Sequence, residues 1–155
     1  MAMVTFMNGS DYSIRLSRLL NDSSRISKEA IFAGANLIAD EIKKNLIENI
    51  QDPESVALNS DAFGAKDSKS TGSLVESFGI SPIEQDASGN WNAKIGFDGY
   101  DSKGIPNQLK ARAMESGTSQ LKKRPFVRPA VNSTKRRAAD KMADVVEREI
   151  KKLKL

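Results

Sequence analysis

Residues 24–50 read SRISKEAIFAGANLIADEIKKNLIENI, and this stretch decides the fold. Its apolar side chains recur every three or four residues, as on one face of an α-helix, and its charged side chains fall mostly on the other face. The pattern predicts an amphipathic helix of about 25 residues. Gly34 costs helix stability, so we interpret it as a close contact with a second helix in preference to a kink. The apolar positions are Ala30, Ile31, Leu37, Ile38, Ile42, Leu46 and Ile50.

The residues before this helix predict a separate N-terminal arm. Residues 11–20 are typical of a short helix, and the Asp-Ser-Ser run at 22–24 predicts a break followed by an N-cap. We therefore expect an arm at residues 1–22 and a single domain at residues 23–155. The first uncharged apolar stretch is too short for a signal sequence or a membrane span, so neither is expected.

The C-terminal residues predict a second long helix. Residues 122–129 are rich in proline and predict an extended segment, and Pro129 suits the first turn of the helix that follows. The apolar stripe of this helix consists of Val131, Ala138, Met142, Val145, Val146, Ile150 and Leu153. Its basic side consists of Arg136, Arg137, Lys141, Arg148, Lys151 and Lys152.

The middle of the chain begins with a polar loop. Residues 51–70 contain few large apolar side chains, which predicts a mobile loop that becomes ordered on a partner. Residues 71–78 then predict one or two helical turns, with Ser70 or Thr71 as the N-cap.

Two runs, residues 79–86 and 91–98, flank a Ser-Gly-Asn turn and predict a β-hairpin. In the second run every other residue is apolar, so one face of the strand is expected to be buried. These alternating residues are Trp91, Ala93, Ile95 and Phe97. Pro82 indicates that the first strand lies at an edge or carries a bulge.

A further short helix is predicted at residues 109–116, with Leu109, Ala113 and Met114 facing inward. Gly117 is expected to end it in a left-handed conformation. This order of elements predicts an α+β fold, in which a long N-terminal helix and a C-terminal helix pack on a small antiparallel sheet.

The composition argues against catalysis. The 155 residues include no Cys and no His, which excludes disulfides, thiolate or imidazole metal sites, and catalysis by Cys or His. Glu115 with Lys110 and Arg112 is the best remaining constellation, but the spacing of Arg112 and Glu115 is typical of an ion pair on a helix. Asp98 and Asp101 are better explained as turn residues than as metal ligands. We expect no enzymatic activity, no metal and no cofactor.

Charge is divided unevenly along the chain. Residues 121–155 carry twelve Lys and Arg against four Asp and Glu, a net charge of +8, whereas residues 1–120 carry twelve against sixteen, a net charge of −4. Such polarity either attracts nucleic acid or pairs the basic tail of one subunit with the acidic body of the next.

Residues 124–130 read RPFVRPA and form the most distinctive segment. Two prolines fix the backbone, and Phe126 lies between two guanidinium groups. The simplest interpretation is that Phe126 anchors the segment on the core while Arg124 and Arg128 reach into water.

Three other blocks precede this segment in a fixed order. They are Thr71, Gly72, Leu74 and Ser77, then the strand at 95–97, then Ala111, Glu115, Gly117 and Thr118. With these four blocks, residues 24–155 resemble the tail-completion, or head–tail joining, proteins of long-tailed double-stranded DNA phages and prophages. The chain departs from that pattern at Ser116, where the family often has an aromatic residue, and at 100–108, where an insertion replaces the usual Tyr-Ala.

The resemblance implies a structural protein of the virion neck that performs no catalysis and is assembled in the host cytoplasm. Such proteins form rings, usually of six subunits, at the end of the tail tube and help to join it to the filled head. The implied partners are further copies of the chain, the tail tube or tail terminator protein, and the head connector or stopper protein. DNA passes through the ring with at most transient contact, and no membrane is involved. The expected interface residues are Glu115, Thr118, Arg124, Phe126, Arg128, Arg136 and Arg137.

An alternative from a different class is a nucleic-acid-binding module that uses the basic C-terminal helix. A binder of single strands needs aromatic side chains on which bases stack, and no aromatic residue follows Phe126. A binder of duplexes needs only phosphate contacts, so this form of the alternative stays open.

Overall fold

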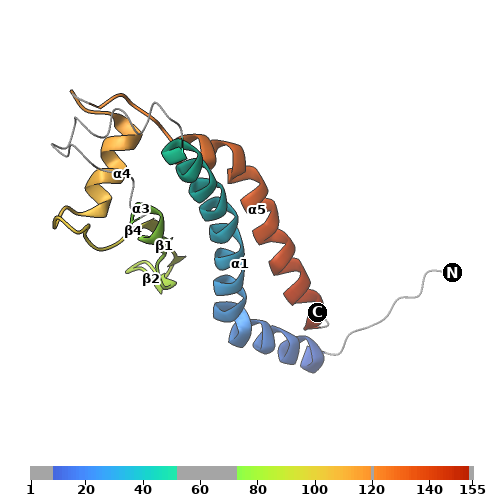
Figure 1. Cartoon of the computed structure of the whole chain (residues 1–155). Coiled ribbons are helices and arrows are strands. Elements are labelled where there is room, and N and C mark those ends of the chain that lie inside the picture. The colour runs from blue at the N-terminus through green and yellow to red at the C-terminus, as the bar shows by residue number, and fades with distance from the viewer. Residues whose placement is uncertain (1–8, 52–72, 120, 154–155) are drawn as a thin grey trace.

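The computed structural model describes residues 9–51, 73–119 and 121–153 (Figure 1). The fold is α+β, as the sequence predicts: two long helices accompany a small antiparallel hairpin and two shorter helices. The loop predicted at 51–70 lies outside the described residues except for Gln51. The elements in chain order are α1 (Gly9–Gln51), α3 (Ser73–Glu76), β1 (Phe78–Ile80), β2 (Glu84–Gln85), β3 (Trp91–Asn92), β4 (Ile95–Phe97), α4 (Asn107–Ser116) and α5 (Val127–Lys152).

Helices α1 and α5 lie side by side and antiparallel (Figure 1). Small side chains line the contact and let the helices approach closely. A Cβ atom added at Gly34 would lie only 2.7 Å from Met142 Cγ, which confirms the predicted close helix contact. The predicted apolar stripe of α1 is shifted, because Ala35 and Ala39 are buried whereas Ile31 is only half-buried. The buried residues of this seam are Ile26, Ala30, Ala35, Ala39, Ile42 and Leu46 on α1, and Ala130, Thr134, Ala138, Val145 and Glu149 on α5.

The predicted break at residues 22–24 is wrong, because α1 runs through it without interruption. The Ser23 hydroxyl donates to the Leu20 carbonyl at 2.8 Å, so it bonds back into the helix and does not cap a new one. Bonds of this kind often bend helices, and Figure 1 shows the first part of α1 at an angle to the rest. Residues 9–25 contribute no buried side chain, and Ile26 is the first buried residue of the helix.

The hairpin forms as predicted, and its ladder is interrupted. Strand β1 pairs antiparallel with β4, and β2 pairs antiparallel with β3. Between the two paired segments, the three residues 81–83 lie opposite the two residues 93–94. The extra residue is a bulge at Pro82, one of the two outcomes that the sequence predicts there. The N–H of Ser81 donates to the Lys94 carbonyl at 2.7 Å and closes the ladder on one side of the bulge.

The apolar core lies where α5 begins. Phe126 packs edge-on against Phe97, with ring centroids 6.0 Å apart, and Phe97 packs against Phe78 at 5.1 Å. The hairpin therefore joins the core through β1 and β4, although none of its residues is fully buried. Trp91 does not join this core, because its ring lies under the Lys28 ammonium at 4.5 Å. The buried members of the core are Ile42, Leu46, Leu74, Ala111, Phe126 and Ala130.

Helix α4 is present and Met114 packs against the core as predicted, but the first turn differs from the prediction. Leu109, expected to face inward, is 58% exposed, and Ala111 is buried in its place. The cause is Asn107, which occupies the inner position of the first turn and donates from Nδ2 to the Asp98 carbonyl at 2.9 Å. A buried asparagine carries no apolar signal, so the period of apolar residues alone places Leu109 on the wrong face.

Candidate functional site

Two of the sequence blocks meet at one joint, where α4 ends and α5 begins. The Glu115 carboxylate accepts the N–H groups of Phe126 and Val127 at 2.8 Å and of Arg128 at 3.0 Å. Partial burial opposes ionisation of Glu115, but these three donors and the nearby Arg128 guanidinium outweigh it, so the pKa of Glu115 lies below its usual value. The carboxylate thus caps the N-terminus of α5 from another helix. The ion pair with Arg112 that the spacing suggested does not form.

The Gly-Thr pair after α4 turns the chain toward this joint. Gly117 has φ 75° and ψ 170°. Its φ is positive, as predicted, but its ψ is that of an extended residue and not that of the left-handed helix. A Cβ atom there would lie 3.0 Å from the Leu121 carbonyl oxygen, so only glycine fits. The Thr118 hydroxyl accepts the N–H of Leu121 at 2.9 Å, which closes the turn. Thr118 is exposed, yet this hydrogen bond gives it a local structural role.

Three residues of the RPFVRPA segment, Arg124, Phe126 and Arg128, differ in exposure. Phe126 is fully buried, and its carbonyl accepts a hydrogen bond from Asn45 at 3.2 Å. A partner cannot reach this side chain, so Phe126 belongs to the core and not to an interface. Arg124 is half-buried, and its N–H donates to the Met114 carbonyl at 2.8 Å. Arg128 is exposed, and only its backbone takes part in the cap.

The central part of α5, residues 135–141, carries exposed cations without ion pairs. Arg136 and Arg137, both predicted at an interface, are exposed, and so are Lys135 and Lys141. Among the described residues none of these four forms an ion pair, and Asp140 is the one acid between them. We call Lys135, Arg136, Arg137 and Lys141 the basic surface.

The last part of α5, residues 148–152, differs, because its cations are paired. Glu149, only 2% exposed, accepts hydrogen bonds from Lys152 at 2.6 Å, from Arg25 of α1 at 3.0 Å and from Arg148 at 3.4 Å. The bonds from Lys152 and Arg25 lower the pKa of Glu149 from 4.5 to about 2. We call these four residues the Glu149 cluster. We call residues 9–25 of α1, which contribute no buried side chain, the α1 arm. The cluster fastens the end of α5 to the base of this arm.

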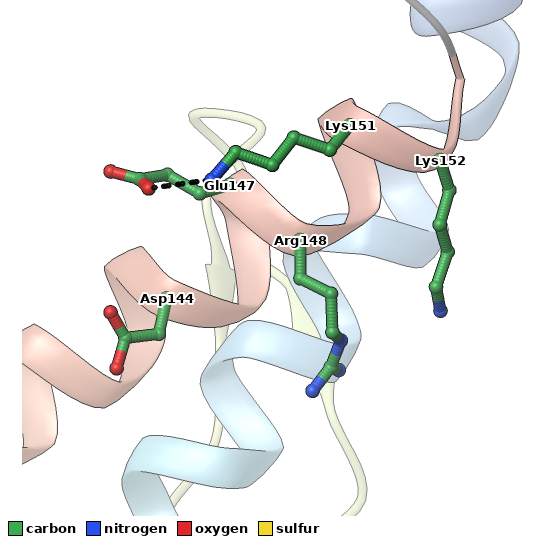
Figure 2. A pocket seen from close by; sticks show the side chains of 5 residues that line it. All are labelled: Asp144, Glu147, Arg148, Lys151 and Lys152. Atoms are coloured by element: carbon green, nitrogen blue, oxygen red, sulfur yellow. Dashed lines mark ion pairs between the residues drawn. The ribbon is translucent and has the colours of Figure 1, made fainter.

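Figure 2 shows a shallow hollow beside this cluster. Arg148 and Lys152 point to one side of α5, and Glu147 and Lys151 form an ion pair at 3.7 Å on the other side. The remaining lining residue is Asp144. All five lining residues are charged and exposed, so the hollow is open to water and lacks the hydrophobic and aromatic residues that line most small-ligand pockets.

A feature that the sequence analysis missed is the apolar surface of the α1 arm. Tyr12, Ile14, Leu16 and Leu20 are 60%, 51%, 44% and 67% exposed. Tyr12, Leu16 and Leu20 recur at four-residue spacing, so they lie on the same side of the helix. That spacing is visible in the sequence, but apolar residues at this spacing also predict a buried face, so the sequence alone does not show that they are exposed. Ile14 lies two residues after Tyr12 and so on another side of the helix. We call Tyr12, Leu16 and Leu20 the arm surface.

The polar groups considered for chemistry have structural roles. The Asp101 carboxylate forms an ion pair with Lys110 and accepts the N–H of Ile105 at 2.8 Å, and these bonds lower its pKa from 3.8 to about 2. Asp98 accepts the N–H of Gly99 at 2.7 Å, as a turn residue does. Within the described ranges, no group of three or more acidic side chains is placed to hold a metal ion. No helix of the described part is long and apolar enough to cross a membrane.

No protein-family model, curated protein or solved structure matches this chain.

Proposed function

We propose that the chain is a structural component of the neck of a long-tailed double-stranded DNA phage. It assembles as a ring at the end of the tail and joins the tail to the DNA-filled head. The arm surface carries this proposal on the structural side. Large apolar side chains exposed together on a helix mark a protein–protein contact, because they lose contact with water when a partner covers them.

The joint at Glu115 supports the same proposal from the sequence side. The resemblance to tail-completion proteins rests on separate blocks, and two of them are physically coupled here. Glu115 of one block caps the helix that begins within the block at 124–130. A pattern of residues far apart in sequence is expected to persist in a family when the residues depend on each other in this way.

Binding of duplex nucleic acid is the second candidate. The observation in its favour is the basic surface, because four exposed cations without ion pairs on one helix suit phosphate contacts. The neck proposal is preferred because the arm surface has no role in phosphate binding.

The first experiment removes the gene from the phage that encodes the chain. Filled heads and complete tails are then expected to accumulate unjoined, and added purified protein is expected to restore joined, infectious particles. Joining at the normal level in the absence of the protein contradicts the proposal.

A matched pair of variants tests the arm surface in the same assay. Leu20→Asp places a charge on the arm, and Leu109→Asp places the same charge on a leucine of α4 that is also largely exposed, at 58% against 67% for Leu20. Both variants should unfold like the unchanged protein, because neither side chain is buried. Only Leu20→Asp should fail to restore joining, and equal activity of the two variants would remove the arm from the contact.

The second candidate is tested by the salt dependence of duplex binding. A true duplex binder loses affinity with salt at a slope of about 0.9 in log K for each phosphate neutralised. The neck proposal predicts weak binding with a shallow slope. Binding tighter than about 1 μM near 150 mM salt, with a slope that implies about six contacts, would favour the nucleic-acid module.

A further inference from the structure

Helix α1 is packed along most of its length but not along its first part. From Ile26 onward its buried side chains lie in the seam with α5 or in the core, whereas the α1 arm contributes no buried side chain. Most of the stability of a helix in a protein comes from the packing of one face, so packing fixes the direction of the later part. A change in the direction of the arm would remove none of its side chains from the core.

The junction between the two parts is a weak segment of the helix. Residues 21–24 read NDSS, and Asn, Asp and Ser compete with a helix because their side chains bond to nearby backbone groups. Ser23 does so here, since its hydroxyl donates to the Leu20 carbonyl at 2.8 Å. Helices bend where a side chain enters their backbone hydrogen bonding, and Figure 1 shows α1 bent between its first part and the rest. The composition therefore places the bend at the base of the arm.

Arg25 ties this junction to the rest of the protein. Its guanidinium donates to Glu149 at 3.0 Å and to Glu29 at 2.9 Å, and it lies 3.7 Å from the Asp22 carboxylate. Asp22 belongs to the arm, Glu29 to the packed part of α1, and Glu149 to α5. The Arg25 side chain is 47% exposed, so water competes for these bonds and they are weak and reversible. A guanidinium in this place can hold one direction of the arm and release it.

We propose that residues 21–25 form a hinge about which the α1 arm swings as an intact helix, and that the bonds of Arg25 are the latch that holds the arm as Figure 1 shows it. The swing redirects the arm surface and leaves the core at Phe126 unchanged. Elements that move on binding are drawn from the least buried parts of a protein, and the arm is such a part. A partner can therefore meet the arm surface at more than one angle. The inference concerns the motion of the arm and is independent of the proposed neck function.

Distances between two spin labels test the hinge. The sequence contains no Cys, so labels attach only to introduced cysteines. Asp11→Cys with Lys43→Cys places one label on the arm and one on the packed part of α1, both at exposed positions. In a straight helix the two Cα atoms would lie about 48 Å apart, so a swing appears as a spread of shorter distances. The reference pair is Lys43→Cys with Lys135→Cys, which joins the packed parts of α1 and α5 and should give a narrow distribution in every variant.

Arg25→Met tests the latch. It removes the bonds of the guanidinium and keeps an apolar stem, while Lys152 and Arg148 remain to hold the Glu149 carboxylate. The share of the arm-to-body distribution outside its main peak should rise by up to about fivefold, as expected for the loss of a half-exposed ion pair. Arg18→Met removes the same charge at an exposed position within the arm, and this control should leave the distribution unchanged.

Ser23→Ala with Ser24→Ala tests the position of the bend. The double variant removes the hydroxyl that bonds to Leu20 and places the best helix former at both positions. The arm-to-body distance should lengthen toward that of a straight helix, and its distribution should narrow. An unchanged distance and width would place the bend outside residues 21–25 and overturn the hinge.

Three further results would overturn the proposal. One is an arm-to-body distribution as narrow as that of the reference pair, both in the unchanged chain and in Arg25→Met. Another is an effect of Arg25→Met no larger than that of Arg18→Met. The third concerns how the arm moves: if Arg25→Met brings hydrogen exchange of the amides at 12–20 to the rate of an unstructured peptide, the arm melts and does not swing.

Discussion

The two ends of the α1–α5 pair are fastened by different physics. At one end, Phe126 is fully buried against apolar neighbours such as Leu46 and Ala130. At the other end, the buried side chain is the Glu149 carboxylate, held by Lys152 and by Arg25 of α1. The apolar end is held mainly by buried volume, with the Glu115 cap beside it, whereas the buried group of the ionic end is itself a carboxylate that responds to pH. Acid should therefore weaken the ionic end at its buried group, and the apolar end only at its Glu115 cap.

The difference matters for the arm. Arg25 is the last residue of α1 before its buried part begins, so the Glu149 cluster lies at the base of the arm. The residues next to the point where the arm joins the rest of α1 are therefore charged groups and not members of the apolar core.

The largest expected effect is at the apolar end. Phe126→Ala should reduce the free energy of unfolding by about 3–5 kcal/mol, because it removes a fully buried ring and leaves a cavity. Chemical denaturation measures the change. Phe32→Ala is the matched control, since Phe32 is 54% exposed and its loss should cost little. Similar losses for both variants would mean that the core does not centre on Phe126.

The cap at the same end should contribute less than the ring. Glu115→Ala removes the acceptor of three N–H groups, and we expect a loss of about 1–2 kcal/mol. Glu115→Gln keeps one acceptor oxygen and should lose less. Glu48→Ala, an exposed acid of α1, is the control and should change stability little. An unchanged denaturation midpoint for Glu115→Ala would show that water caps α5 equally well.

The sequence predicted the apolar end better than the ionic end. The alternation in the hairpin and the rigid RPFVRPA segment led to Phe126 as the anchor, because burial of apolar side chains follows local patterns. The Glu149 cluster joins residues 124 positions apart, and an acid on a helix normally indicates an exposed face. The cap at Glu115 was missed for a related reason, since the sequence spacing showed only the nearer candidate, Arg112.

The sequence also did not predict that α1 continues through residues 22–24. The Asp and Ser residues at 22–24 are typical of helix N-caps. Such a side chain can either accept a backbone N–H at the start of a helix or, for Ser, donate to a preceding carbonyl within one. The choice made by Ser23, which bonds to Leu20, depends on whether the helix continues. Here Asp22 and Glu29 also pair with Arg25, so local contacts within the helix favour continuation.

Acid should loosen the ionic end through Glu149. The pKa of Glu149 is about 2 in the folded chain and 4.5 as an ordinary glutamate, so its contribution is complete above about pH 4.5 and is lost as the pH falls toward 2. The melting temperature of Glu149→Gln should therefore fall less steeply between about pH 5 and pH 2 than that of the unchanged chain. Glu147→Gln, at an exposed ion pair, should keep the unchanged slope. Equal slopes for Glu149→Gln and the unchanged chain would contradict the assignment.

The smallest effect on stability is expected at Arg128, although it lies beside Phe126. Its N–H donates to Glu115, but its side chain is exposed, so Arg128→Ala keeps the cap and should change the free energy of unfolding by less than about 0.5 kcal/mol. If Arg128 faces a carboxylate of a neighbouring protein in the proposed neck, the same variant should fail to join tails to heads. Arg128→Lys should not restore joining, because an ammonium lacks the planar fork of a guanidinium. Thermal unfolding and the joining assay together decide between two other outcomes. Normal joining would remove the interface role, and a large loss of stability would instead place the Arg128 side chain among the groups that hold α5 to the body.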